Sequence, residues 1–393
     1  MIDDPIYNDI RPYRDHEFKA EMGKLLDSPH SDLLISTVFP DMPVGMVKDH
    51  LRTISTINEF QEKVIYKAVM NILAKTSAGL SKSGLENLDV TSAYLFMSNH
   101  RDIILDPGLI NTVIFEQGFE TAEVAIGDNL LQTPWVKDLA RLNKSFIVKR
   151  NLPVRELINS SRLLSNYIKD TIVKNNHSVW IAQREGRAKD GNDRTQPGLL
   201  NMVGISAEGS LKAHLMRLNI LPVSLSYETD PCDVDKARSL YSLKFFGGYT
   251  KEENEDNLAM RKGILGYKGN IHIHFGKPIR DEIAALPDDL HKNELIQQVG
   301  VLLDKQIIGN YHLFKTNRIA YDILNKSNDD YTFYSAKEKH AFIEDIEQKI
   351  STMAGDPLEL KTIFLEMYAR PYQNQLLMEK SDPLHVFGLL IHK

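Results

Sequence analysis

The feature of the sequence that most constrains the fold is a series of short apolar runs, rich in branched and aromatic residues, that alternate with longer helix-like segments. The runs lie at residues 93–97, 122–126, 145–148, 178–182, 220–227 and 271–275. Such runs are typical of strands, and runs that are apolar on both faces are typical of strands buried between two helical layers. The alternation therefore predicts an α/β fold, with a mostly parallel or mixed sheet flanked by helices.

The segments on either side of this pattern are predicted to be helical. Apolar residues between Val47 and Ile72 recur mostly at helical spacing, which predicts one helix that ends before the turn-forming stretch SAGLSKSG. The helical pattern returns after the last strand and continues to the end of the chain. We therefore expect a helical N-terminal region at 1–84, the α/β domain at 85–310 and a helical C-terminal region at 311–393.

The composition excludes several classes of function. The 393 residues carry a formal net charge of −6, which argues against a dedicated nucleic-acid binder. The single cysteine, Cys232, can form no intrachain disulfide and has no zinc-binding spacing around it, so a cytoplasmic location is expected. The N-terminus lacks a signal-peptide pattern, and no stretch approaches ~18 consecutive apolar residues. Contact with a membrane is therefore expected from one side only.

A motif suited to proton transfer follows the first apolar run, in the stretch SNHRDIILDPGLIN at residues 98–111. We expect a loop after the strand and a helix that begins at Gly108. His100 would then lie at a strand end, where α/β folds bind ligands, and a nearby carboxylate would make it a general base. Asp106 and Asp102 are the candidate carboxylates. The alternative is that Asp106 only caps the helix and His100 is a surface residue.

Charged residues also follow the later strands. Lys149 and Arg150 end the stretch SFIVKR, and Arg184, Glu185, Gly186, Arg187 and Lys189 lie in WIAQREGRAKDG. These cations could hold a phosphate, and a glycine lets backbone N–H groups approach an anion. Pro222 in ILPVSLSYE stiffens the chain after the next strand begins. Each feature alone is more often a solvated turn, but a parallel sheet gathers these strand ends on one edge.

Taken in order, the stretches NHRDIILD, SFIVKR, REGR and LPVSLSYE resemble the four sequence blocks of the glycerolipid acyltransferases. The resemblance covers about residues 85–280. It is closest to the glycerol-3-phosphate and dihydroxyacetone-phosphate branch, because HRD is similar to that branch's His-Arg-Ser start and EGRAKDG to its Glu-Gly-Gly-Arg-Ser-Arg-Thr-Gly stretch. The segment that follows the fourth block and the strand IHIHFGKPI also resemble that branch.

The resemblance implies an O-acyltransferase of phospholipid biosynthesis. It would move a fatty acyl chain from acyl-CoA or acyl carrier protein to a hydroxyl of glycerol 3-phosphate or a lysophosphatidate-like acceptor. His100 would remove the hydroxyl proton while Asp106 stabilises the imidazolium, and the reaction needs no cofactor and no acyl-enzyme. The expected acceptor-binding residues are Lys149, Arg150, Glu185, Gly186 and Arg187.

The sequence departs from the family pattern at the reacting pair. The family has four residues between His and Asp, whereas five separate His100 from Asp106. The loop before the helix can absorb the extra residue, which favours Asp106, because Pro107 marks the turn into that helix. The alternatives are that Asp102 orients the imidazole or that the pair is broken.

Other functions and partners follow from the same residues. The acceptor could be an amino-acid lipid or another lysolipid, and a protein with a broken pair would be a noncatalytic scaffold that binds lipid or acyl carrier. Fatty substrates predict reversible peripheral binding at the inner face of a membrane. The candidate contact segments are residues 36–47, 135–144 and 386–393.

Two stretches resemble motifs of other enzyme classes, but each lacks one residue that the motif requires. Pro107 stands where a kinase catalytic loop needs its metal-binding asparagine, and Asn192 stands where a phosphate-binding loop needs lysine. His272 and His274 share one face of the last strand, but the sequence offers them no third ligand. We therefore predict no metal site.

Overall fold

The centre of the protein is a seven-stranded sheet. The structure is a computed structural model that describes residues 4–150, 152–252, 254–327 and 329–380. The strands are β1 (Gly79–Ser83), β2 (Leu95–Ser98), β3 (Glu123–Gly127), β4 (Ser145–Val148), β5 (Val179–Ala182), β6 (Ile220–Tyr227) and β7 (Asn270–Phe275), in the order β1-β7-β6-β2-β5-β3-β4. β6 and β7 pair antiparallel, and every other neighbouring pair is parallel. The predicted α/β fold with a mixed sheet is confirmed.

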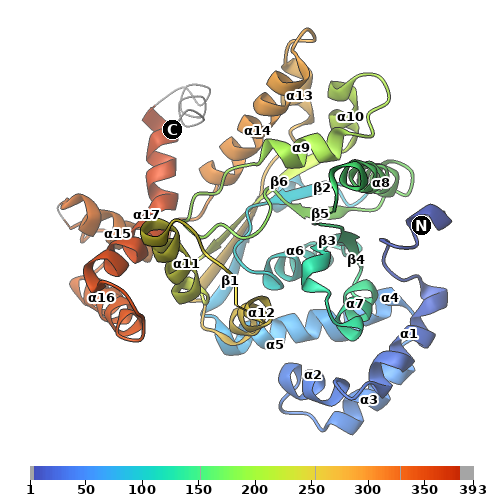
Figure 1. The fold of residues 1–393 in the computed structure, drawn as a ribbon, viewed down its shortest axis with the longest axis horizontal. Helices are drawn as coiled ribbons and strands as arrows, with labels where there is room; N and C mark the ends of the chain where they lie inside the picture. Colours follow the sequence, from blue (N-terminus) through green and yellow to red (C-terminus); the bar gives the residue numbers. More distant parts are fainter. Residues whose placement is uncertain (1–3, 151, 253, 328, 381–393) are drawn as a thin grey trace.

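Helices cover both faces of this sheet (Figure 1). On one side lie α5 (Tyr66–Thr76), α6 (Leu105–Glu116), α7 (Pro134–Leu142) and α12 (Glu255–Leu265). On the other lie α8 (Val154–Val173), α9 (Pro197–Gly204), α10 (Leu211–Arg217), α13 (Arg280–Ala285) and α14 (Lys292–Gly309). Because both faces are covered, strand residues pointing either way are buried, which explains the continuous apolar runs in the sequence.

Alternation along the strands divides the core in two. Leu95 and Met97 of β2 pack in the cluster that contains residues of α8 and α14, whereas Tyr94 and Phe96 pack in the cluster that contains residues of α5 and α6. Successive side chains of a strand point to opposite faces, so each strand contributes to both clusters. Trp180 of β5 belongs to the cluster with α5 and α6. The same face carries the candidate site.

Strand β1 was not predicted, and it precedes the predicted domain boundary at residue 85. It pairs with β7 from Gly79↔Asn270 to Ser83↔His274, at the edge of the sheet. Its sequence, GLSKS, is polar, and none of its five residues is buried. An edge strand of this kind lacks the apolar signal that marks the six strands predicted correctly.

The single helix predicted between Val47 and Ile72 is wrong. The chain instead forms α3 (Val44–Thr53), α4 (Ile57–Phe60), a π-helical turn η2 (Gln61–Ile65) and α5. The break occurs because Thr56 caps the new helix: its hydroxyl accepts from the Glu59 N–H at 3.2 Å, and the Glu59 carboxylate accepts from the Ser55 N–H at 2.8 Å. Ser/Thr followed three residues later by Glu is a helix-start signal that interrupts the apolar spacing.

Helical regions at both ends complete the molecule. At the N-terminal end, α1 (Asp15–Asp27), α2 (Ser31–Val38) and α3 share an apolar cluster with Leu142 of α7. At the C-terminal end, α15 (Lys315–Asn325), α16 (Ala336–Ile350) and α17 (Pro357–Lys380) pack on Ala237 of α11 (Asp233–Phe246). Short 3-10 helices lie at Pro5–Tyr7, Leu85–Asn87 and Asp128–Leu130.

Candidate functional site

The candidate site lies where five parallel strands end. β2, β3, β4, β5 and β6 run in the same direction, so their carboxyl ends meet at one edge of the sheet. This is the position at which open α/β sheets place ligands. The loop after β2 carries His100, and the loop after β5 carries Arg187.

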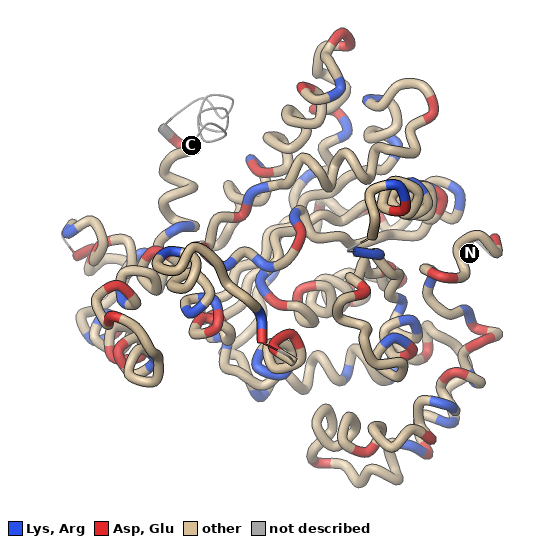
Figure 2. The backbone as a smooth tube through the Cα atoms, viewed as in Figure 1, with Lys and Arg blue, Asp and Glu red and all other residues tan. Residues whose placement is uncertain are grey.

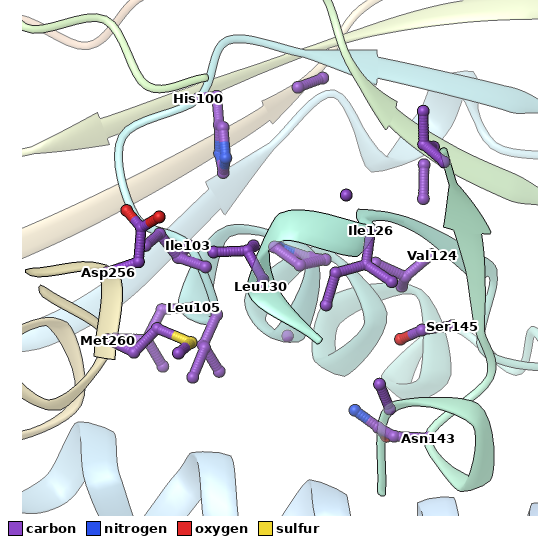
Figure 3. Close-up of a pocket in the computed structure, with 18 of the residues that line it drawn as sticks. His100, Ile103, Leu105, Val124, Ile126, Leu130, Asn143, Ser145, Asp256 and Met260 are labelled. Carbon is purple, nitrogen blue, oxygen red and sulfur yellow. The ribbon is translucent and has the colours of Figure 1, made fainter. Parts of the chain in front are cut away.

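His100 and Asp106 are in direct contact. The imidazole Nδ1 lies 2.8 Å from the Asp106 Oδ2 atom, and the Asp106 side chain is fully buried. Because a carboxylate only accepts hydrogen bonds, Nδ1 carries the ring proton and Nε2 is the basic nitrogen. His100 projects into a cavity (Figure 3), so this basic nitrogen is available to a ligand. Of the two candidate aspartates, Asp106 is the one that reaches the imidazole.

Asp106 is held in place by three further donors. Its Oδ2 atom accepts from the backbone N–H groups of Arg101 at 2.6 Å and Asp102 at 2.9 Å, and its Oδ1 atom accepts from the Tyr227 hydroxyl at 2.8 Å. Burial, followed by the negative charge of Asp106, raises the pKa of Tyr227 well above its usual value, so the hydroxyl keeps its proton. Tyr227 ends β6 in the stretch LPVSLSYE, but only the fold shows that it faces Asp106.

Asp102 has a different role. Its Oδ1 atom accepts from the backbone N–H groups of Ile104 at 2.9 Å and Leu105 at 2.7 Å, at the first turn of α6. Helix α6 therefore begins at Leu105 and not at the predicted Gly108, and Pro107 lies in the first turn, where its missing N–H costs no hydrogen bond. Burial, followed by the charge of Asp106, raises the pKa of Asp102.

Two contacts fix the loop that carries His100 and Asp102: one with the Trp180 ring and one with Gly263. The Trp180 ring meets the His100 ring edge-on, with centroids 5.8 Å apart, and its indole N–H donates to the Ser98 hydroxyl at 3.0 Å. Gly263 of α12 packs against Asp102, since a Cβ at that glycine would lie 1.9 Å from Asp102 Oδ2. Trp180 and Gly263 were not predicted, because their roles arise from contacts between segments that are distant in the sequence.

The predicted acceptor-binding residues lie around the same cavity. Lys149, Arg150, Glu185, Gly186 and Arg187 all line it together with His100, and so do Arg184 and Lys189. Arg150 forms an ion pair with Glu185 at 3.3 Å, and Lys149 lies 3.8 Å from Asp9. Gly186 has a φ of +70°, a conformation that favours glycine. Within the described residues, the buried Nη1 atom of Arg187 has no hydrogen-bond partner, which leaves a donor free for an anion.

The cavity has a second, apolar side that the sequence reasoning missed. Its volume is about 1260 Å³, and its apolar side is lined from α1, α2, α5 and β3 by Met22, Leu25, Leu34, Ile35, Ala68, Ile72, Val124 and Ile126. We call this part the apolar arm. A large pocket with an apolar lining and a few converging polar groups is typical of a site that binds a small-molecule ligand. The N-terminal helices are thus part of the site and not only a lead-in.

Charged residues of both signs are spread over the described part of the chain (Figure 2). His272 contacts the Ser81 and Ser83 hydroxyls, and burial lowers its pKa to about 4, so it is neutral near pH 7. Within the ranges that the structure describes, no group of three or more His, Cys, Asp or Glu residues could hold a metal ion.

Part of the chain is similar in sequence to known acyltransferases. Residues 79–225 match the acyltransferase family model. The dihydroxyacetone phosphate acyltransferase of Bos taurus is 25% identical over 218 residues, which is 55% of this chain and 30% of that protein. The chain thus matches less than a third of that relative's length. The crystal structure of the 1-acyl-sn-glycerophosphate (LPA) acyltransferase PlsC from Thermotoga maritima aligns with 74% of this chain and 93% of its own, at 13% identity and a TM-score of 0.38.

The family segment contains each residue of the candidate site that the sequence predicted. His100 and Asp106 lie after β2, Arg150 after β4, and Glu185 and Arg187 after β5, all within residues 79–225. This segment of the chain is therefore similar to the acyltransferase family.

Proposed function

We propose that the protein transfers a fatty acyl chain from a thioester donor, acyl-CoA or acyl carrier protein, to a hydroxyl of a phosphorylated glycerol or lysolipid acceptor. One observation carries the proposal. His100, oriented by Asp106 at 2.8 Å, opens onto one cavity that has arginines on one side and an apolar arm on the other. A base, an anion site and a hydrocarbon site in one cavity are what this reaction requires.

The transfer can be written in two steps. His100 Nε2 takes the proton of the acceptor hydroxyl while the oxygen attacks the thioester carbonyl carbon and forms a tetrahedral intermediate. The C–S bond then breaks, and the leaving sulfur takes the proton back from the imidazolium, which yields the ester and a free thiol. Asp106 stabilises the imidazolium between the two steps, because its buried negative charge lies against the protonated ring.

The acceptor phosphate would bind at the arginine side. Arg187 has an unused buried N–H donor, and Arg150 can exchange its surface ion pair with Glu185 for a phosphate. Guanidinium groups bind phosphate through paired hydrogen bonds, which fixes the orientation of the acceptor as well as its position. Glu185 would then be free to accept a hydrogen bond from an acceptor hydroxyl.

The activity is tested by thioester turnover with the purified full-length chain. We expect thiol release from hexadecanoyl-CoA or hexadecanoyl acyl carrier protein to depend on an acceptor, with glycerol 3-phosphate, dihydroxyacetone phosphate, a lysophosphatidate and a lyso amino-acid lipid compared side by side. The acceptor that supports turnover identifies the reaction. A folded protein that turns over no donor with any of these acceptors would favour the noncatalytic scaffold.

The acyl chain would occupy the apolar arm, and Ala68 of α5 provides a test. The substitution Ala68→Leu adds bulk to the wall of the cavity, so a long chain that reaches α5 should fit less well. Overpacking of about 1–3 kcal/mol corresponds to a fall of about 5- to 150-fold in kcat/KM for a hexadecanoyl donor. Turnover of a butanoyl donor should stay within about twofold, since a short chain does not need the same space.

The matched control is Ala285→Leu, an exposed alanine on α13 away from the cavity lining. It should leave the ratio of long-chain to short-chain turnover unchanged. An equal loss for both donors in Ala68→Leu would show that the apolar arm does not hold the chain.

We further propose reversible binding to the inner face of a membrane from the cytoplasm. Met42 and Met46, in the predicted contact segment 36–47, are 45% and 61% exposed. Segment 135–144 is largely helix α7, whose Leu142 is buried, and segment 386–393 lies outside the described residues. Among the helices that the structure describes, none has the length and apolar character to cross a bilayer.

Vesicle flotation measures this association. With vesicles that contain anionic lipid, a fraction of the protein should float with the lipid, and Met42→Ser/Met46→Ser should reduce that fraction because it removes exposed apolar surface. Protein that stays wholly in the aqueous layer at low salt would rule out the association.

A further inference from the structure

The apolar arm contains a group of polar side chains that acyl transfer does not require. Gln61, Asn143 and Ser145 all line the cavity, among the apolar residues that the N-terminal helices, α7 and β3 contribute. We call these three residues the distal recess. Figure 3 shows Asn143 and Ser145 at the end of the cavity away from His100, with their polar atoms directed into it. They are therefore placed to meet the acyl chain at a distance from the reacting thioester.

The hydrogen-bonding capacity of the distal recess is only partly used. The Gln61 Nε2 atom donates to the Asn143 Oδ1 atom at 2.8 Å. That bond uses neither the Gln61 oxygen nor the Asn143 amide nitrogen, and the Ser145 side chain lines the same cavity. Gln61 and Ser145 are 4% and 5% exposed, and their side chains line the cavity, so a molecule that fills the cavity displaces the water that could otherwise meet them.

Polar groups in such a position are costly unless a ligand pairs with them. A buried donor or acceptor without a partner costs about 1–3 kcal/mol, and an aliphatic chain lying against it supplies no partner. Gln61 is also the first residue of the π-helical turn η2, which interrupts the helix between Ile57 and Thr76. Single π-turns of this kind often occur at functional sites. Packing alone would be satisfied by apolar side chains at all three positions.

We propose that the distal recess binds an oxygen-bearing group, a hydroxyl or a keto group, carried on the acyl chain far from its thioester. The Asn143 amide donates, the Gln61 oxygen accepts, and the Ser145 hydroxyl does either, so the three groups match a hydroxyl, which needs both a donor and an acceptor. This inference rests on the proposed function, because it takes the acyl chain as the occupant of the apolar arm. It assigns a class of donor, hydroxyacyl or oxoacyl thioesters, to this protein.

Direct binding of free fatty acids to the full-length chain tests the recess without requiring turnover. The probes are hexadecanoic acid and a series of hydroxyhexadecanoic acids in which the hydroxyl moves along the distal half of the chain, measured by displacement of a fluorescent fatty acid. One or two adjacent hydroxyl positions should bind about tenfold more tightly than the other positions, the gain expected from one or two net hydrogen bonds. Equal affinity for all hydroxyl positions would overturn the proposal.

Substitutions test whether the distal recess causes the preference for one hydroxyl position. Ser145→Ala removes one oxygen atom and should lower the affinity for the preferred isomer about fivefold, while the affinity for hexadecanoic acid stays the same. Asn143→Leu should abolish the preference, and if that variant does not fold, Ser145→Ala still decides. The matched control is Ser161→Ala, a serine of α8 that also lines the cavity, and it should leave the preference intact. A preference that survives Ser145→Ala and Asn143→Leu would overturn the assignment.

Failure of this proposal can be told apart from failure of the proposed function. Selective binding of one hydroxy acid without any thioester turnover would support the proposal for the distal recess and contradict the proposed acyltransferase activity. Efficient turnover of hexadecanoyl donors, with no preference among the hydroxy acids, would contradict the proposal for the distal recess and support the proposed acyltransferase activity.

Discussion

Replacing His100 with alanine should lower the rate of acyl transfer by about 10²–10⁴-fold at saturating donor and acceptor, which is the usual contribution of a general base. The hydroxyl of the acceptor is a poor nucleophile while it keeps its proton, and His100 is the histidine that lines the cavity together with the arginines. The fall should be in kcat with little change in the KM of either substrate, since His100 acts on the reacting hydroxyl and not on the phosphate or the acyl chain. Steady-state thiol release measures both constants.

Two controls accompany this experiment: a substitution of a histidine outside the cavity and a measurement of stability. His340 on α16 is exposed and outside the cavity, so His340→Ala should leave kcat unchanged. His100→Ala should keep the unfolding temperature of the unmodified protein within a few degrees, because the imidazole is partly exposed and only one side-chain hydrogen bond, itself partly buried, is lost. A folded His100→Ala variant with undiminished turnover would mean that another group removes the proton.

The sheet was predictable because most of its strands carry the signal that sequence reasoning detects. Strands such as β6 are apolar on both faces, and residues 220–227 match the predicted run. Strand β1 and the break before α4 were not predicted, and the reason is the same for both. Each depends on a few polar residues, which do not change the apolar periodicity from which the helices and strands were predicted. GLSKS is a strand only because β7 offers an edge to it, and Thr56 ends a helical pattern through a single cap.

The site was predictable to the extent that one strand edge gathers its parts. His100, Arg150 and Arg187 follow different strands, and their proximity follows from the parallel order of those strands. The partners of these residues were not predictable. Tyr227 reaches Asp106 across 121 residues of sequence, and the N-terminal helices enter the cavity through apolar contacts that have no motif. Sequence patterns report local periodicity and spacing, whereas these contacts depend on how distant elements pack.

Replacing Asp106 with asparagine should separate the charge of this residue from its structural role. An asparagine oxygen can accept from His100 Nδ1 and from the N–H groups of Arg101 and Asp102, while its amide nitrogen turns to the Tyr227 hydroxyl, which can accept. The fold and the position of the imidazole should therefore survive. The negative charge that stabilises the imidazolium is lost, and a charged hydrogen bond of about 1.5–3 kcal/mol corresponds to a fall of about 10- to 150-fold in kcat.

Asp106→Ala should have a different effect, and the comparison decides between the two roles. Alanine leaves the imidazole N–H, two backbone N–H groups and the Tyr227 hydroxyl without their acceptor in the interior, and each such group costs about 1–3 kcal/mol. The free energy of unfolding should fall by at least about 3 kcal/mol, measured by denaturant titration, whereas Asp106→Asn should lose much less. If Asp106→Asn were as active as the unmodified chain, the carboxylate would serve only to hold the loop, because the hydrogen bonds would remain and the charge would be shown to contribute nothing to the transfer.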